Sequence, residues 1–123
     1  MDHRNDSEVC DLFKKIESDH GKLDILVNNA FQVPIRPDEK SDPDLLFRNF
    51  WEQPGWFWDS FIDVGLRSHY IASCYAVPVM NKRTSLNGRM PLIVHISSFG
   101  GIFIINIYNC TMIKYMYRSI LFF

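Results

Sequence analysis

Two short apolar runs in this sequence each end on a pair of small polar residues. The run ILV is followed by Asn28 and Asn29, and the run LIVHI is followed by Ser97 and Ser98. An amide can bond exposed backbone groups, and a hydroxyl can bond an alcohol or carbonyl oxygen. In an open parallel sheet, ligands lie just beyond the carboxyl ends of the strands. The two polar pairs therefore predict one crevice that is lined by hydrogen-bonding groups from two strands.

The elements that must position these residues begin with a helix near the N-terminus, which Asp6 or Ser7 could cap. Its apolar residues recur at the spacing of one buried helical face, and they are Val9, Leu12, Phe13 and Ile16. A polar turn over 18–22 ends this helix. Residues 23–28 then have the continuous apolar character of a strand that is buried on both faces. A helix followed by a buried strand indicates an α/β fold.

The segment between the two apolar runs contains a loop and a long helix. Residues 31–56 carry four prolines among charges, which indicates a surface excursion that either shapes a substrate pocket or binds nothing. Residues 58–77 are predicted to form the longest helix, closed by Pro78. This helix is apolar on two sides, so it needs two neighbours, one of which could be a second subunit. Residues 92–97 are the second predicted strand, reached by a right-handed crossover.

Composition and charge exclude several classes of protein. The chain has 123 residues, 47% of them hydrophobic, which suits one globular domain. All 14 acidic residues precede residue 64. The basic residues after that point are spread out, so we expect no nucleic-acid partner. The three cysteines and four histidines lack ligand spacing, so we expect no metal site. The polar start predicts an intracellular protein, in the cytoplasm.

The last 22 residues, 102–123, have a different character. They are rich in Ile, Phe and Tyr, contain no acid, and show neither a helical nor an alternating period. Their uninterrupted apolar part falls far short of the roughly 20 residues that cross a bilayer. We therefore expect no membrane span here, and association of this tail with a membrane surface is the weakest of the open hypotheses.

The order of several short segments resembles a known family. "LDILVNNA", followed about seventy residues later by "LIVHISSFGG", is similar to the central part of the short-chain dehydrogenase/reductases. The segments "FWEQP" and "WDSFIDVGLRSHY" resemble one branch of that family. The resemblance extends from about Val9 to Gly101. N-N-A alone is a weak motif, whereas the ordered combination is specific.

The resemblance implies a fold, a reaction and site residues. The fold would be a partial Rossmann-like doubly wound parallel sheet, and the reaction would be hydride transfer between NAD or NADP and a small alcohol or carbonyl substrate. Asn28 and Asn29 would brace the central sheet. Asn29 and Ala30 would lie near the ribose of the cofactor, and Ser98 would orient the substrate oxygen.

The sequence also departs from the family pattern. Gly65 stands where many relatives have the Asn of a proton relay, and Phe31 replaces the last Gly of N-N-A-G. The glycine-rich turn that binds the pyrophosphate is not found in this sequence. No Tyr-x-x-x-Lys pair occurs at the family's offset from the serine, because Tyr108 and Lys114 are six positions apart. A Tyr without a nearby cation keeps a high pKa and is a poor acid at neutral pH.

These observations predict a partial dehydrogenase domain over residues 1–101 and a divergent apolar tail over 102–123. The expected function is that of a fragment of an NAD(P)-dependent short-chain oxidoreductase, inactive alone. The alternative is a non-enzymatic partner that joins an intact subunit, or another copy of the chain, through the 58–77 helix. The substrate and the choice between NAD and NADP remain open at this stage.

Overall fold

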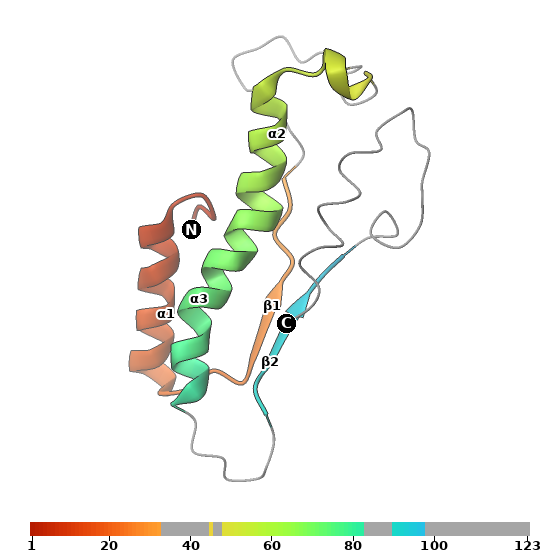
Figure 1. Ribbon diagram of the computed structural model, residues 1–123. Helices are drawn as coiled ribbons and strands as arrows, with labels where there is room; N and C mark the ends of the chain where they lie inside the picture. The colour runs from red at the N-terminus through yellow and green to blue at the C-terminus, as the bar shows by residue number, and fades with distance from the viewer. Residues whose placement is uncertain (33–44, 46–47, 83–89, 98–123) are drawn as a thin grey trace. The chain divides into compact units, whose positions relative to one another are not determined.

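The computed structural model describes residues 1–32, 45, 48–82 and 90–97. The chain divides into two compact units, of which the first comprises residues 1–31 and 62–96 and the second residues 32–61 and 97–123. The first unit holds both strands and the two longest described helices (Figure 1). The predicted boundary at residue 101 and the tail 102–123 lie outside the described residues and stay predictions.

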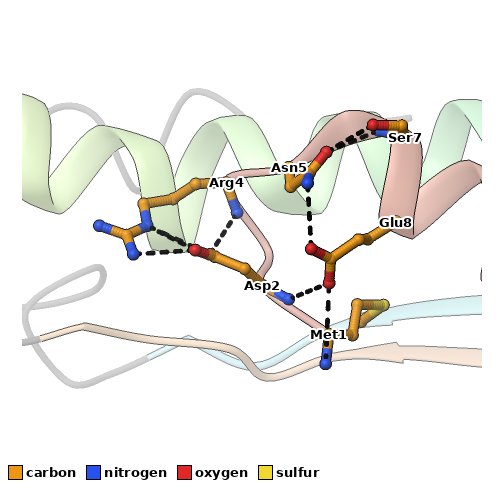
Figure 2. A network of polar contacts seen from close by, with 6 residues as sticks. All are labelled: Met1, Asp2, Arg4, Asn5, Ser7 and Glu8. Carbon is orange, nitrogen blue, oxygen red and sulfur yellow. Dashed lines mark hydrogen bonds and ion pairs between the residues drawn. The ribbon is translucent and has the colours of Figure 1, made fainter.

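Helix α1 (Asp6–His20) begins one residue earlier than the capping prediction, because Asn5 is its N-cap. Asn5 Oδ1 accepts a hydrogen bond from the Ser7 backbone N–H at 3.2 Å, which satisfies one of the exposed donors of the first turn. The Asn5 amide donates to Glu8 Oε1 at 3.0 Å, so cap and first turn are linked in both directions (Figure 2). Gly21, with φ 68°, ends the helix in a left-handed turn.

Strands β1 (Ile25–Asn28) and β2 (Leu92–His95) pair in parallel, which confirms the parallel α/β fold. Ile25 lies opposite Leu92, and the register continues without a break to the last residue of each strand. A parallel pair requires a crossover connection. Part of that connection is helix α3 (Ser68–Asn81), which returns the chain to the start of β2.

The core of the first unit lies between α1, α3 and one face of the two strands (Figure 1). Its buried members come from both helices and are Val9, Phe13, Ala72, Ala76, Val79 and Met80. Leu26 and Ile93, one from each strand, pack against this cluster. Apolar side chains from four elements therefore join in a single cluster, as expected for one layer of helices on a sheet.

The prediction of a strand buried on both faces is wrong. Side chains of a strand alternate between faces, so Leu26 and Asn28 point toward the helices while Ile25 and Val27 point away. Ile25 is 56% exposed and Val27 is 54% exposed. In the part of the chain that the structure describes, α1 and α3 pack on the same face of the strands, and nothing covers the opposite face.

The single long helix predicted over 58–77 is also wrong. Helix α2 (Gly55–Phe61) ends early, and the segment η3 (Ile62–Arg67) separates it from α3. The backbone leaves helical geometry at Val64 (φ −116°, ψ 95°) and Gly65 (φ 146°, ψ −50°). The φ angle of Gly65 is one that residues with a Cβ atom rarely adopt, so glycine permits the break.

Pro78 does not close the helix, because α3 continues through it to Asn81. A proline inside a helix cannot donate the usual backbone hydrogen bond and normally disfavours continuation. Val79 and Met80 follow Pro78 directly, and each is only 3% exposed. Continuing the helix buries these two side chains in the core, which offsets the lost hydrogen bond.

Charged pairs join α1 to α3 near both ends. The Arg67 guanidinium donates two hydrogen bonds to the Asp6 carboxylate, at 2.7 and 2.6 Å. At the other end of the helices, the Lys82 ammonium contacts Glu17. The start of α1 therefore lies beside the start of α3, and the two helices run parallel (Figure 1).

The second unit contains η2 (Phe50–Glu52) and α2 among its described residues. Phe57 is 3% exposed, and the rings of Trp56 and Phe61 meet it edge to face at centroid distances of 5.9 and 5.1 Å. Most of the predicted loop 31–56 lies outside the described residues. Across the described ranges, every helix is too short or too polar to span a membrane.

Candidate functional site

The carboxyl ends of β1 and β2 form the candidate site of the first unit. Asn28 and His95, the last residues of the strands, are register partners. The Ile96 backbone N–H donates to the Asn28 carbonyl at 2.9 Å, so the pairing continues just past the end of β2. Asn29 and Ala30 therefore leave the sheet at the same edge as Ile96. The two strands therefore end at one edge, as the parallel pairing requires, and the crevice predicted there stays a prediction.

Asn28 is turned inward at this edge and is only 4% exposed. Its amide nitrogen lies 3.1 Å from Ser73 Oγ and 3.5 Å from His95 Nδ1. The Ser73 hydroxyl donates in turn to the His69 carbonyl at 2.7 Å. The buried amide thus connects β1 to both α3 and β2, which is the bracing role expected of it. A buried amide with such partners avoids the cost of an unsatisfied polar group.

His69, in the first turn of α3, is also part of this cluster and contacts the backbone that follows β1. It is 7% exposed, and its Nε2 lies 3.0 Å from the Ala30 carbonyl oxygen. A carbonyl only accepts hydrogen bonds, so we assign the Nε2–H tautomer to this ring. Burial lowers the pKa of His69 below its ordinary value, although the bond to Ala30 acts in the opposite direction.

His95 contributes a second imidazole to the same cluster. The rings of His69 and His95 are 5.8 Å apart between centroids and are tilted by 46°. His95 Nδ1 lies 3.5 Å from the Asn28 amide nitrogen, so the His95 ring borders the buried amide. Within the described residues, no group of three or more His, Cys, Asp or Glu side chains is placed to hold a metal ion.

Asn29 is turned the other way. Its side chain is exposed and the structure gives it no hydrogen bond within the described residues, so there the bracing role expected of both amides falls to Asn28 and not to Asn29. Ala30 follows it and is half-buried. An exposed amide of this kind can exchange hydrogen bonds with the hydroxyl groups of a ligand. The described ranges contain no glycine-rich turn.

The predicted catalytic residue Ser98 lies outside the described residues. Ser97, directly before it, is exposed at the end of the pairing between the strands. The roles assigned to Ser98, Asn29 and Ala30 therefore stay predictions. Gly65 is buried at the break before α3.

Sequence reasoning did not identify His69 and Ser73 as members of this site. His69 falls on the same helical stripe as Ala72 and Ala76, and a histidine on an apolar stripe is usually part of the core. The available signal was the spacing of His69 and Ser73, which are four residues apart and so share one face of a helix. A polar pair on the buried face of a helix needs a polar partner, and Asn28 is that partner.

Comparison with known proteins gives consistent matches. The family profile described as "Enoyl-(Acyl carrier protein) reductase" matches residues 1–115. The mouse protein "Dehydrogenase/reductase SDR family member 1" is 37% identical over 105 residues, and its human counterpart is 36% identical. Each alignment covers 82% of this chain and 29% of the relative. The chain therefore spans less than a third of the length of the curated relatives that it matches.

Solved structures match at the level of the fold. Aldohexose dehydrogenase from Thermoplasma acidophilum has a TM-score of 0.70 and 24% identity, over 96% of this chain and 39% of that protein. The NADH-dependent enoyl-[acyl-carrier-protein] reductase of Aquifex aeolicus has a TM-score of 0.71 and 22% identity, over 96% and 42%. ElxO with bound NADP has a TM-score of 0.67 and 23% identity, over 97% and 39%.

Proposed function

The chain belongs to the short-chain dehydrogenase/reductase family, and on that premise we propose that it is part of an NAD(P)-dependent oxidoreductase that acts on an alcohol or carbonyl group. When bound, the nicotinamide cofactor supplies or accepts the hydride. The observation that supports this proposal is the paired edge at Asn28 and His95, which turns the Asn29 side chain outward.

The proposed roles follow the chemistry of each residue. Asn29 and the backbone beyond it bind the ribose of the cofactor, and Asn28 holds that backbone to the sheet. Ser98 bonds the substrate oxygen through its hydroxyl. The sequence contains no Tyr-x-x-x-Lys pair, in which the lysine would lower the pKa of the tyrosine, so we propose that this chain does not turn over substrate by itself.

Binding and turnover are tested separately with the full chain. Amide signals are followed by NMR during titration with NADPH and with NADH to millimolar concentration. We expect weak, saturable shifts at Asn29 and Ala30, and a dissociation constant that rises about threefold to tenfold in Asn29→Ala, as the loss of one hydrogen bond predicts. Asn81→Ala is the matched control, because it removes an exposed amide at the far end of α3.

Each part of the proposal has its own contradicting result. Shifts spread evenly over the surface, or an unchanged affinity in Asn29→Ala, would sink the cofactor assignment. Oxidation of NADPH by the purified chain with any of a panel of aldehydes and ketones would show that the chain is active alone.

A second candidate function rests on the outer face of α3. Tyr70 and Val77 are 63% and 41% exposed, and Cys74 lies between them and is also exposed. These three residues are spaced at i, i+4 and i+7, so they share one stripe of the helix. The Tyr70 phenol is uncharged at neutral pH, and its contact with Cys74 raises its pKa further. Such a stripe suits docking onto another subunit of the same family.

The docking function is tested by mixing the chain with the full-length human relative and measuring mass by light scattering after size exclusion. We expect a mixed complex that Val77→Asp weakens. Asn81→Asp, which adds the same charge to the exposed end of the same helix, should leave it intact. If no mixed complex forms at micromolar concentration, the docking function is excluded.

A further inference from the structure

At the end of β1, three successive residues direct their polar groups alternately toward α3 and away from it. Asn28 is buried with its amide toward α3, the Asn29 side chain is exposed, and the Ala30 carbonyl turns back to α3. The two inward contacts flank the outward residue. The direction of Asn29 therefore depends on both contacts, of which the Asn28 amide supplies one and the His69 ring the other.

The His69 contact is specific in its geometry. Its Nε2 is 3.0 Å from the Ala30 oxygen, within the range of a good hydrogen bond. The ring is held in place by its burial and by its position in the first turn of α3, where its own backbone carbonyl accepts from Ser73. A shorter side chain in the place of His69 would hold its donor too far from the Ala30 carbonyl to form this hydrogen bond.

From this geometry we infer that His69 is a positioning residue: its Nε2–H ties the Ala30 carbonyl to α3 and so fixes the backbone that presents Asn29. This inference rests on the proposed function for its consequence, which is cofactor binding. The contact itself does not depend on that function. His69 touches neither the substrate nor the cofactor in this assignment, and it acts only through Ala30.

The positioning role of His69 predicts a pH dependence at Asn29 and Ala30 that packing alone would not produce. The groups whose charges act on this ring are His95 on β2 and His3 in the N-terminal segment, and both oppose a positive charge on it. Burial, the largest influence on the ring, also disfavours the positive charge. The imidazolium keeps its Nε2–H, so protonation places a positive charge beside the Ala30 carbonyl and changes the environment of Asn29 and Ala30.

Two substitutions with the same chemistry and different reach test the inference. Gln places an amide donor near the position of the imidazole Nε2, whereas Asn places one near Nδ1, too short to reach Ala30. In the full chain without cofactor, we expect the Asn29 and Ala30 amide shifts to be close to those of the natural protein in His69→Gln and displaced in His69→Asn. The exposed His20→Gln is a control for the loss of an imidazole.

The pH profile and the tautomer provide independent readouts. Nitrogen NMR of the natural chain at pH 7.5 should show a proton on His69 Nε2 and none on Nδ1. The Asn29 and Ala30 shifts should titrate with a midpoint below 6.5, the ordinary value for His, and this titration should vanish in His69→Gln. If the NADPH dissociation constant is measurable, it should rise about tenfold in His69→Asn and less than about threefold in His69→Gln.

The two proposals fail in different ways. If no cofactor binds to the natural chain while the tautomer and the Gln–Asn difference hold, the proposed function is wrong and the positioning role stands. A proton on Nδ1, or equal shifts at Asn29 and Ala30 in the Gln and Asn variants, would overturn the positioning role whatever the cofactor does. If His69→Asn does not fold, the tautomer and the pH titration of the natural chain still decide.

Discussion

Asn28 and His95 end the two parallel strands opposite each other, with the amide nitrogen of one 3.5 Å from Nδ1 of the other. Both strands therefore stop at the same level, and their next residues leave the sheet together. The same amide lies 3.1 Å from Ser73 Oγ on α3. One side chain thus connects three elements at the edge where the proposed cofactor site lies.

Asn28→Ala should lower the free energy of unfolding by about 1–3 kcal/mol, because it removes a buried donor and leaves its partners unsatisfied. Urea unfolding followed by circular dichroism measures this change. Asn29→Ala is the natural comparison, because it removes the same group from an exposed side chain and should change stability by less than about 0.5 kcal/mol. Equal losses in the two variants would show that Asn28 does not brace the sheet.

The stability of the chain should fall as the pH is lowered below about 6.5, the ordinary pKa of His. The pKa of His69 is lowered in the folded state, so the unfolded chain takes up this proton first and is favoured by acid. Urea unfolding at pH 7.5 and 5.5 measures the difference, which His69→Gln should reduce and His20→Gln should not. Arg67 lowers the pKa of Asp6 below 3.8, so that pair loses its contribution in a separate, more acidic range.

Gly65→Ala should destabilise the chain by about 1–3 kcal/mol, the usual cost of holding a residue with a Cβ atom in a strained backbone region. The φ angle of Gly65 is 146°, and the residue is buried. Gly55→Ala is the matched control, because a Cβ atom there meets nothing within 4 Å and its φ is not in the strained range. Similar thermal midpoints for the two variants would argue against strain at Gly65.

Val27→Thr combined with Leu92→Thr should reduce self-association of the chain. Within the described residues, both side chains are more than half exposed on the strand face that points away from α1 and α3, at 54% and 53%. Threonine has the β-branched shape that strands favour, and it removes apolar surface at both positions. Sedimentation velocity at several concentrations measures the effect. Met90→Gln removes a more exposed apolar side chain that is not in a strand, and it should have a smaller effect.

The fold could be predicted where the spacing of apolar residues along the sequence also determines which side chains are buried in the core. Val9 and Phe13 recur on one helical face and lie in the core, and the two apolar runs are parallel strands. The break at Gly65 could not be predicted, because the apolar spacing continues across it and a helix tolerates a glycine at a cost of about 1 kcal/mol. At Pro78 the sequence predicts a helix end that the structure does not have. Burial of the next two residues outweighs the usual tendency of proline to end a helix.

The candidate site could be predicted only in part. The ends of the strands at Asn28 and Asn29 follow from the change from apolar to polar residues. The contact between His69 and Ala30 joins residues 39 positions apart, and no local spacing carries that information. It depends on where α3 lies on the sheet, which only the packed structure defines. The role of Ser98 stays a prediction.

The charged pairs that join α1 to α3 at both ends restrict how these helices can move. Sliding one helix along the other by a single turn is a displacement of about 5.4 Å, which would open the Asp6–Arg67 and Glu17–Lys82 pairs at the same time. Splaying of the helices opens only one pair while the other serves as the pivot. Slow fluctuations of this helical layer should therefore be tilting motions, and the axial alignment of the two helices should persist through them.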